Sequence, residues 1–237
     1  MFGGPKFNPD KDIPDQSGKV VLVTGANVGL GKETDIEREV SGSHKIVSFL
    51  QLDLTSFDSV KRAAAAVTSQ VDRLDLLVNN AGIMATPAGW TKGGYGLQSG
   101  GAGVRVVNIS SAGETTAPKA GWPADMSVYK TDMADVWTLT RYGASKLANI
   151  HFTKALQRRN PDIKCAAVHP GVVATSLLLA SPSRTPFSAG CPEVKPGEFY
   201  HPLGVTGKGS ALSSDEAQAQ RLWEWTEKEL DAYLEQK

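Results

Sequence analysis

The chain has 237 residues, with 25 lysines and arginines balancing 25 aspartates and glutamates, and 41% of its residues are hydrophobic. This length favours one domain with a sizeable core, and the zero net charge leaves no basic surface of the kind that binds nucleic acid. Cys165 and Cys191 supply neither a disulfide framework nor a metal-ligand spacing, so we expect no metal site and a reducing compartment. The sequence shows no apolar core segment of a signal peptide and no apolar run long enough to span a bilayer. We therefore expect a cytoplasmic protein without a membrane span.

The first predicted elements are a strand, a glycine turn and a helix, after an irregular lead-in over residues 1–18. The β-branched run Val20 to Val23 predicts a short strand buried on both faces. Three glycines follow at once, and a helix is predicted from about Leu30 to Val40. In this context Gly25 permits a tight turn, Gly29 lets the backbone approach a pyrophosphate, and Gly31 lets the helix pack on the strand. An ordinary strand-to-helix loop is the alternative interpretation of this stretch.

Strands and helices alternate along the rest of the chain. Further strands are predicted at Lys45–Leu54, Leu74–Val78, Val104–Ile109 and Ile163–Val168, and helices after Thr55 or Ser56, over Thr138–Arg159, and over 213–235. The segments between them, 83–103, 112–136 and 180–210, are predicted as loops. This order predicts an α/β fold with a mostly parallel, doubly wound sheet in a single domain over residues 1–237.

Tyr142 and Lys146 are the first candidate catalytic pair, because they lie one turn apart on one face of the predicted long helix. An unperturbed tyrosine has a pKa of about 10, and a lysine ammonium beside it favours the phenolate. Such pairs are also common on solvated helix faces, so the pair needs support from elsewhere. Ser111 gives that support, since it ends a predicted strand at the sheet edge where α/β proteins bind ligands.

Several motifs, in order along the chain, resemble the short-chain dehydrogenase/reductase family in its single-domain form. They are T-G-A-N-V-G-L-G at 24–31, N-N-A-G at 79–82, V-N-I-S-S at 107–111, Y-G-A-S-K at 142–146 and H-P-G at 169–171. The chain is most similar to the retinol-dehydrogenase-like branch and its fungal relatives, through the long interval between Ser111 and Tyr142 and the tail L-W-E-W-T-E-K-E-L. The resemblance implies a Rossmann-type, NAD(P)-dependent oxidoreductase that interconverts an alcohol and its carbonyl compound.

The resemblance also implies roles for individual residues. Tyr142 would be the general acid or base, Lys146 would lower its pKa and hold the nicotinamide ribose, and Ser111 would bind the reacting oxygen. Ser110 is the weaker candidate, since the family's serine follows its asparagine by three positions. The implied coenzyme-binding residues are Thr24, Gly25, Asn27, Gly29, Leu30, Gly31, Asp53, Leu54, Asn80, Ala81, Gly82, Tyr142, Lys146, Pro170, Gly171 and Thr175. The implied partner is a small alcohol or carbonyl substrate, and a homodimer is one candidate assembly because many relatives dimerise.

Three parts of the family pattern are missing from this sequence. Only Lys32 to His44 separates the glycine turn from the L-D-L-T segment, where the family has a further strand and helix. The family helix that carries the asparagine of the catalytic tetrad has no counterpart between Gly82 and Val104, and the substrate-covering region 180–210 is shortened around 181–195. We therefore expect a sheet without one family strand and a fold without one or more family helices. These losses favour an alternative function, a catalytically impaired nucleotide-binding or regulatory relative that is degenerate or mis-spliced.

The choice between NADP and NAD depends on Asp53. This residue follows Gly31 by about 20 positions, where the general dinucleotide fingerprint places a ribose-binding acid. The family pattern instead makes Asp53 the aspartate on the adenine side. If the strand at 46–52 pairs with the strand at 20–24, Asp53 meets the ribose and favours NAD, whereas the family resemblance favours NADP.

The remaining reactive side chains are predicted to be structural. Three histidines lack any metal-ligand spacing and are predicted on the surface or in loops: His44, His151 and His201. Cys165 is predicted to be a buried, unreactive thiol, and Trp223 and Trp225 are predicted to be packing residues.

Overall fold

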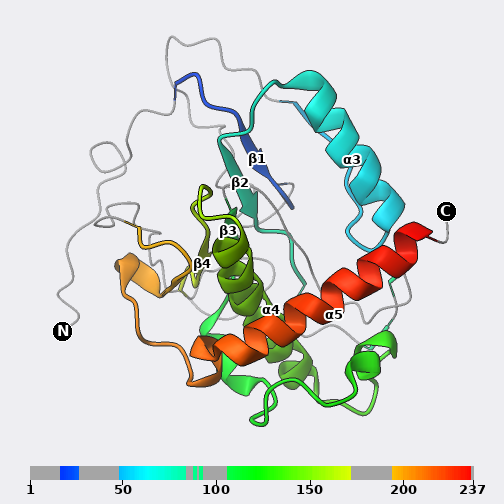
Figure 1. Ribbon diagram of the computed structural model, residues 1–237, viewed down its shortest axis with the longest axis vertical. Coiled ribbons are helices and arrows are strands. Elements are labelled where there is room, and N and C mark those ends of the chain that lie inside the picture. Colours follow the sequence, from blue (N-terminus) through cyan, green and yellow to red (C-terminus); the bar gives the residue numbers. More distant parts are fainter. Residues whose placement is uncertain are drawn as a thin grey trace, which may run out of the picture.

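A computed structural model describes residues 17–26, 48–83, 88–89, 91–92, 106–171 and 194–235. Within these residues the strands form one sheet, in which neighbours pair in parallel and follow the order of the chain (Figure 1). The strands are β1 Val21–Val23, β2 Leu76–Asn79, β3 Val106–Ile109, β4 Ala166–Val168 and β5 Phe199–Tyr200. This arrangement confirms the predicted α/β class with a parallel sheet.

The pairing register brings the ends of the strands to one edge of the sheet. Val23 pairs with Val78, Asn79 with Asn108, and Ile109 with Val168. Because all these strands are parallel, the residues that follow them gather at the carboxyl edge, where α/β sheets bind ligands. The sheet therefore places the candidate motifs after β1, β2, β3 and β4 side by side.

The described residues include three α-helices: α3 Phe57–Gln70, α4 Thr138–Arg159 and α5 Glu216–Glu235. The bounds of α4 are those predicted from the sequence. It packs against β3 and β4 on one side and against α5 on another (Figure 1). The C-terminal end of α5 reaches the start of α3, where the rings of Phe57 and Tyr233 lie 4.6 Å apart and the Tyr233 hydroxyl donates to Asp58. Within the described residues, no helix combines the length and the apolar character needed to cross a membrane.

Short 3₁₀ helices complete the fold and line the core. They are η1 Ala112–Thr116, η2 Met126–Lys130, η3 Pro202–Gly204 and η4 Leu212–Ser214. One core cluster joins α4 to η2 and to the residues just before it: Ala117, Trp122, Met126, Tyr129, Ala144 and Leu147. The predicted loop 112–136 therefore contains two helical turns that pack on α4, and η4 lies just ahead of α5 at the start of the predicted C-terminal helix.

His151 links these parts, and its prediction as a surface or loop residue was wrong. Its side chain is fully buried within α4. The Trp122 indole donates to its Nδ1 at 3.0 Å, and its Nε2 lies 2.7 Å from the Leu212 carbonyl. Because Trp122 can only donate, Nε2 carries the proton and donates to Leu212. This neutral imidazole fastens the segment before η2 and the start of η4 to the middle of α4.

The predictions for Cys165 and the two tryptophans are confirmed. Cys165 is fully buried, and burial raises the pKa of its thiol. Trp223 stacks on Phe152 at 5.4 Å between ring centroids, and Trp225 packs against the core cluster on α4. The two tryptophans therefore help to build the interface between α4 and α5.

The strand predicted at 45–54 was wrong for the residues that the structure describes. Residues 48–54 form no strand, and β1 pairs only with β2 among the described residues. The amide of Asp53 donates to Ser59 Oγ at 3.0 Å, so this segment folds onto the start of α3 instead of running along β1. Phe49 in it is 85% exposed. The hypothesised pairing of strands 46–52 and 20–24 is thus not found over 48–52, and residues 46–47 lie outside the described residues.

The end of the segment predicted as loop at 180–210 also differs from the prediction. Phe199 and Tyr200 are buried and pair with Ala167 and Val168 as strand β5. A strand of two residues leaves too short a pattern to be recognised locally. The helix predicted at 30–40 and the central part of the shortened region, 172–193, lie outside the described residues.

Candidate active site

Ser111, Tyr142 and Lys146 come together at the carboxyl edge of the sheet. Ser111 follows the end of β3, while Tyr142 and Lys146 occupy the first turns of α4. Gly113 shows how close the first two lie, because a Cβ placed on it would stand 2.7 Å from Tyr142 Cε1 and 3.3 Å from Ser111 Oγ. Lys146 Nζ lies 5.5 Å from the centroid of the Tyr142 ring. The sequence-predicted catalytic residues therefore form one compact group.

Hydrogen bonds between β3 and α4 fix this group. Lys146 Nζ and Asn149 Nδ2 both donate to the Ile109 carbonyl, each at 3.1 Å. In return, Ser110 Oγ donates to the Lys146 carbonyl at 2.7 Å and is almost fully buried. Ser110 is thus committed to holding the helix, while Ser111 stands beside the tyrosine ring.

A second layer of amide side chains supports these contacts. Asn79 donates to Asn108 Oδ1 at 2.9 Å, and Asn108 donates to Thr153 Oγ1 at 2.7 Å, so β2, β3 and α4 are linked in sequence. Thr153 in turn donates to the Asn149 carbonyl. Sequence reasoning had given Asn149 and Gly113 no role. Asn149 could have been recognised as a candidate because it lies one helical turn after Lys146. No local sequence pattern indicated that Gly113 lies against the Tyr142 ring.

The electrostatics of the pair differ from the sequence-based expectation. Burial raises the pKa of Tyr142 above its usual value, and the hydrogen-bonding Ser111 hydroxyl opposes that rise. Burial also lowers the pKa of Lys146 to about 8. The amine donates to the Ile109 carbonyl and lies over the tyrosine ring, and the net shift of the Tyr142 pKa is upward, opposite to the lowering expected from the sequence. Tyr142 is therefore protonated at neutral pH.

The turns after β1 and β2 are clamped together beside this group. Thr24 Oγ1 accepts from the amides of Asn80 and Ala81 at 3.1 and 3.0 Å, and Asn80 Nδ2 donates to the Thr24 carbonyl at 3.0 Å. Gly25 has φ +67°, and a Cβ on it would lie 2.8 Å from Ala81 Cα, so no other residue fits there. A Cβ on Gly82 would lie 3.7 Å from Lys146 Nζ, so the second turn extends from the clamp to the candidate catalytic group.

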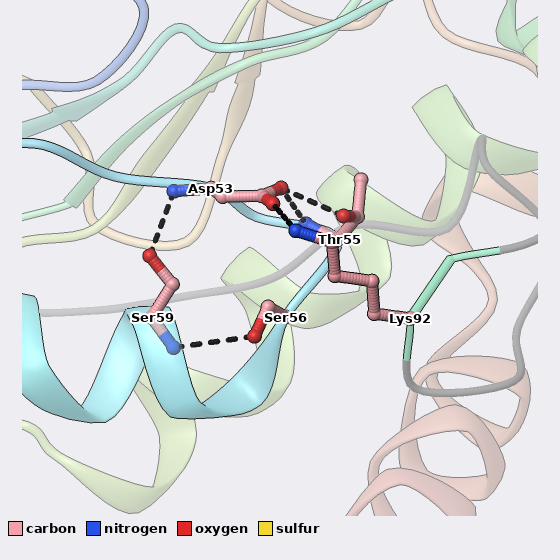
Figure 2. A network of polar contacts seen from close by, with 5 residues as sticks. All are labelled: Asp53, Thr55, Ser56, Ser59 and Lys92. Atoms are coloured by element: carbon pink, nitrogen blue, oxygen red, sulfur yellow. Dashed lines mark hydrogen bonds and ion pairs between the residues drawn. The ribbon is translucent and has the colours of Figure 1, made fainter.

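The other predicted coenzyme residues fall in three places. Pro170 and Gly171 follow β4 at the same edge, and the Gly171 amide donates to His169 Nδ1 at 3.3 Å. Asp53 and the exposed Leu54 lie at the start of α3, where Lys92 donates to the Asp53 carboxylate at 2.7 Å (Figure 2). The remaining five lie outside the described residues: Asn27, Gly29, Leu30, Gly31 and Thr175. In the described residues between Gly82 and Val106 there is no helix to carry a fourth catalytic asparagine.

Comparison with known proteins gives a family match over most of the chain. Residues 15–219 match the family model described as Enoyl-(Acyl carrier protein) reductase. The chain is 32% identical to an uncharacterized oxidoreductase of Schizosaccharomyces pombe. That alignment covers 73% of this chain and 65% of the relative. It is 31% identical to the short-chain dehydrogenase/reductase drtF of Aspergillus calidoustus, covering 92% of this chain and 95% of the relative. It is also 31% identical to human retinol dehydrogenase 13, over 68% of this chain and 60% of that protein.

The comparison with drtF also bears on the missing segments. That alignment runs over 303 residues, more than the 237 residues of this chain, so the relative has stretches with no counterpart here. Among solved structures, an uncharacterized protein from Mycobacterium paratuberculosis matches with a TM-score of 0.70 at 24% identity, covering 94% of this chain and 97% of that one. An NADPH-bound carbonyl reductase from chicken fatty liver matches with a TM-score of 0.51 at 19% identity, covering 80% and 98%. These two structures show that the fold is shared.

Proposed function

Because the chain belongs to the short-chain dehydrogenase/reductase family, we propose that it is an NAD(P)-dependent oxidoreductase that interconverts an alcohol and its carbonyl compound. The observation that carries this proposal is that Ser111 and Lys146 both lie close to the Tyr142 side chain at the carboxyl edge of the sheet.

The residues present fit a nicotinamide dinucleotide. The clamp between Thr24 and Asn80 and the bare backbone at Gly25 form a cradle at the strand ends, of the kind that lets a main chain approach a pyrophosphate. Lys146 uses one donor on the Ile109 carbonyl, which leaves two of its three N–H groups for ribose hydroxyls. The dinucleotide, when bound, supplies the hydride.

The protein's own part is to hold the substrate oxygen and move a proton. In reduction, the Ser111 hydroxyl donates a hydrogen bond to the carbonyl oxygen, and Tyr142 transfers its phenolic proton to that oxygen as the alkoxide forms. The Lys146 ammonium stabilises the phenolate that remains. The raised pKa of Tyr142 keeps its phenol protonated at neutral pH, which is the form that can donate a proton to the substrate oxygen.

A catalytically impaired nucleotide-binding relative is the second candidate. It is favoured by the length of the alignment with drtF and by the lack of a helix in the described residues between Gly82 and Val106. Both candidates bind nucleotide, and only the first turns over a substrate. The two are therefore separated by activity, not by binding.

The test is a titration with NADPH and NADH followed by a carbonyl-reduction assay. We expect saturable binding, and turnover that falls at least about 100-fold in Tyr142→Phe, the loss typical of a missing general acid. Tyr129→Phe is the matched control, because Tyr129 is buried in the core cluster away from the strand ends and should keep its activity. Binding without turnover on a broad carbonyl panel would favour the second candidate, and no binding by the folded chain would refute both.

The cytoplasmic location and the homodimer stay predictions from the sequence. Light scattering after size-exclusion chromatography tests the homodimer, which requires twice the mass of the 25.2 kDa chain. Imaging of the tagged full chain in cells tests the location.

A further inference from the structure

The turn that follows β4 lies beside the candidate catalytic group. The Ser110 amide donates to the Val168 carbonyl at 2.7 Å, so the residues that follow β3 and β4 leave the sheet next to each other. In the proposed function the hydride passes to a carbon whose oxygen is held by Ser111 and Tyr142, so the nicotinamide must lie close to these two side chains. The turn after β4 is therefore near enough to the nicotinamide for its shape to affect binding.

This turn is closed by a single side chain, His169. The His169 amide donates to the Tyr200 carbonyl at 2.7 Å and completes the pairing of β4 with β5. Pro170 has no N–H, so the next backbone donor is the Gly171 amide. Gly171 has φ +86°, a conformation that favours glycine, and its amide donates to His169 Nδ1 at 3.3 Å. The imidazole of the first residue thus holds the third.

The imidazole can accept this bond only while it is neutral. Because Nδ1 is the acceptor, the proton of the neutral ring is on Nε2, and a second proton on Nδ1 would turn the acceptor into a donor that faces the Gly171 amide. Burial lowers the pKa of His169, and the neighbouring His201 lowers it further. His169 is therefore neutral at pH 7 and loses its acceptor only in acid.

The groups around His169 do not compensate a positive charge on it. The rings of His169 and His201 lie 5.4 Å apart in an edge-to-face arrangement, and His201 Nε2 is buried without a hydrogen-bond partner within the described residues. Glu114 raises the pKa of His201 and Lys208 lowers it, but burial has the larger effect and lowers it. Both carboxylate oxygens of Glu114 accept hydrogen bonds from Ser210. Within the described part of the chain, neither imidazole forms an ion pair with a carboxylate.

We propose that His169 is a positioning residue for the nicotinamide end of the coenzyme, which acts by accepting the Gly171 amide and fails once its imidazole is protonated. The inference rests on the proposed function, since it concerns how the dinucleotide of that site is held. With the neutral imidazole in place, the turn is already ordered when the coenzyme arrives; without it, the coenzyme has to order the turn at a cost in affinity. The proton and the coenzyme therefore oppose each other's binding.

Calorimetry at pH 7 tests the acceptor, with NADP⁺ and NAD⁺ and with two fragments that lack the nicotinamide, adenosine 2′,5′-bisphosphate and 5′-ADP. His169→Phe should weaken the preferred coenzyme about fivefold, the effect of one hydrogen bond, and leave the fragments unchanged. His169→Asn should keep the wild-type affinity, because an asparagine carbonyl accepts the amide two residues further on. His201→Phe is the matched control: it makes the same change at the neighbouring ring, which accepts no amide within the described residues, and should bind like the wild type.

The pH profile tests the neutral imidazole. As the pH falls from 7 to 5, the affinity of the wild type for the oxidised coenzyme should fall relative to that of His169→Asn, by a factor that approaches about tenfold per pH unit below the pKa of His169. The ratio of the two affinities cancels the titration of the nucleotide and of every other group in the chain. If His169→Phe does not fold, this comparison decides alone.

The outcomes separate this inference from the proposed function. Three results would overturn the positioning role while leaving a coenzyme-binding protein: wild-type affinity in His169→Phe, an equal loss in His169→Asn, or parallel pH profiles of His169→Asn and the wild type. A loss of fragment binding in His169→Phe as large as the loss of coenzyme binding would overturn it too, because the effect would not be confined to the nicotinamide end. No binding of either coenzyme by a chain that is folded by circular dichroism overturns both proposals.

Discussion

Replacing Lys146 with methionine should stabilise the protein at neutral pH while weakening its function. Burial lowers the pKa of Lys146 to about 8, from 10.5 in an unfolded chain. At 1.36 kcal/mol per pKa unit, keeping the ammonium charged in the folded state costs about 3 kcal/mol. Methionine removes that cost and also the hydrogen bond to the Ile109 carbonyl, which is worth about 1 kcal/mol. The net gain is about 2 kcal/mol, or about 6 °C in melting temperature for a chain of this size.

The pH dependence of this gain identifies its cause. A lysine whose folded pKa is lowered binds fewer protons in the folded than in the unfolded state between about pH 8 and 10.5, so wild-type stability rises with pH in that window. The full cost is present below pH 8, and less than about 1 kcal/mol remains at pH 10. The advantage of Lys146→Met should therefore shrink between pH 7 and pH 10.

Thermal unfolding of the two proteins at pH 7 and pH 10 measures this difference. Lys61→Met is the control, since it makes the same change at an exposed position of α3 and should show no such convergence with pH. Calorimetric titration with NADPH gives the functional arm, in which Lys146→Met should bind more weakly because it cannot donate to ribose hydroxyls. An advantage that is absent at pH 7, or that stays constant up to pH 10, would refute the argument from a buried ammonium.

Three further predictions concern groups that position the site. Gly113→Ala places a Cβ 2.7 Å from Tyr142 Cε1, so the ring should be displaced from its position. The rate constant of reduction in single-turnover kinetics should fall at least about tenfold, while the affinity for NADPH stays near wild type. An equal loss of rate and affinity would contradict a local displacement of the ring. Thr24→Val removes the acceptor of the Ala81 amide, whereas the Asn80 amide keeps its bond to the Val78 carbonyl. The change should cost about 1–2 kcal/mol in urea unfolding, and a cost near zero would mean that the clamp is dispensable. Burial lowers the pKa of His151, so the imidazole of the unfolded chain gains its proton first and the stability of the wild type should fall as the pH drops below 6.5. His151→Phe leaves the Trp122 indole N–H without its acceptor, so this variant should unfold more easily at pH 7. The stability of the variant should no longer depend on pH in this range.

Elements with a strong local pattern were predictable from the sequence. The long helix Thr138–Arg159 has the predicted bounds, and β1, β2, β3 and β4 lie within or next to the β-branched runs assigned to strands. Each of these signals is contained in the segment itself. The spacing of Tyr142 and Lys146 on a helix, and of Ser111 at a strand end, placed the candidate catalytic group for the same reason.

What the sequence could not supply depends on partners distant along the chain. Residues 45–54 alternate like a strand, but a strand also needs a neighbour, and Asp53 bonds to the first turn of α3 instead. Conversely, Phe199 and Tyr200 have almost no pattern and become a strand through pairing with β4. The burial of His151 depends on Trp122 and η4, and the pKa of Tyr142 depends on how deeply its ring is buried. None of these contacts is encoded by local spacing.

The hydrogen bonds that anchor the catalytic group explain how its arrangement is kept in a chain that lacks segments present in its relatives. The bonds that hold Lys146, Ser110 and Asn149 in place run between β3 and α4. The clamp between Thr24 and Asn80, by contrast, joins β1 to β2. Losses elsewhere in the chain leave both units with their internal bonds, but a dinucleotide must reach across both. Nucleotide binding is therefore the property that the missing segments affect most. Because the catalytic group keeps its own bonds, a chain that binds NADPH saturably should also reduce a carbonyl substrate.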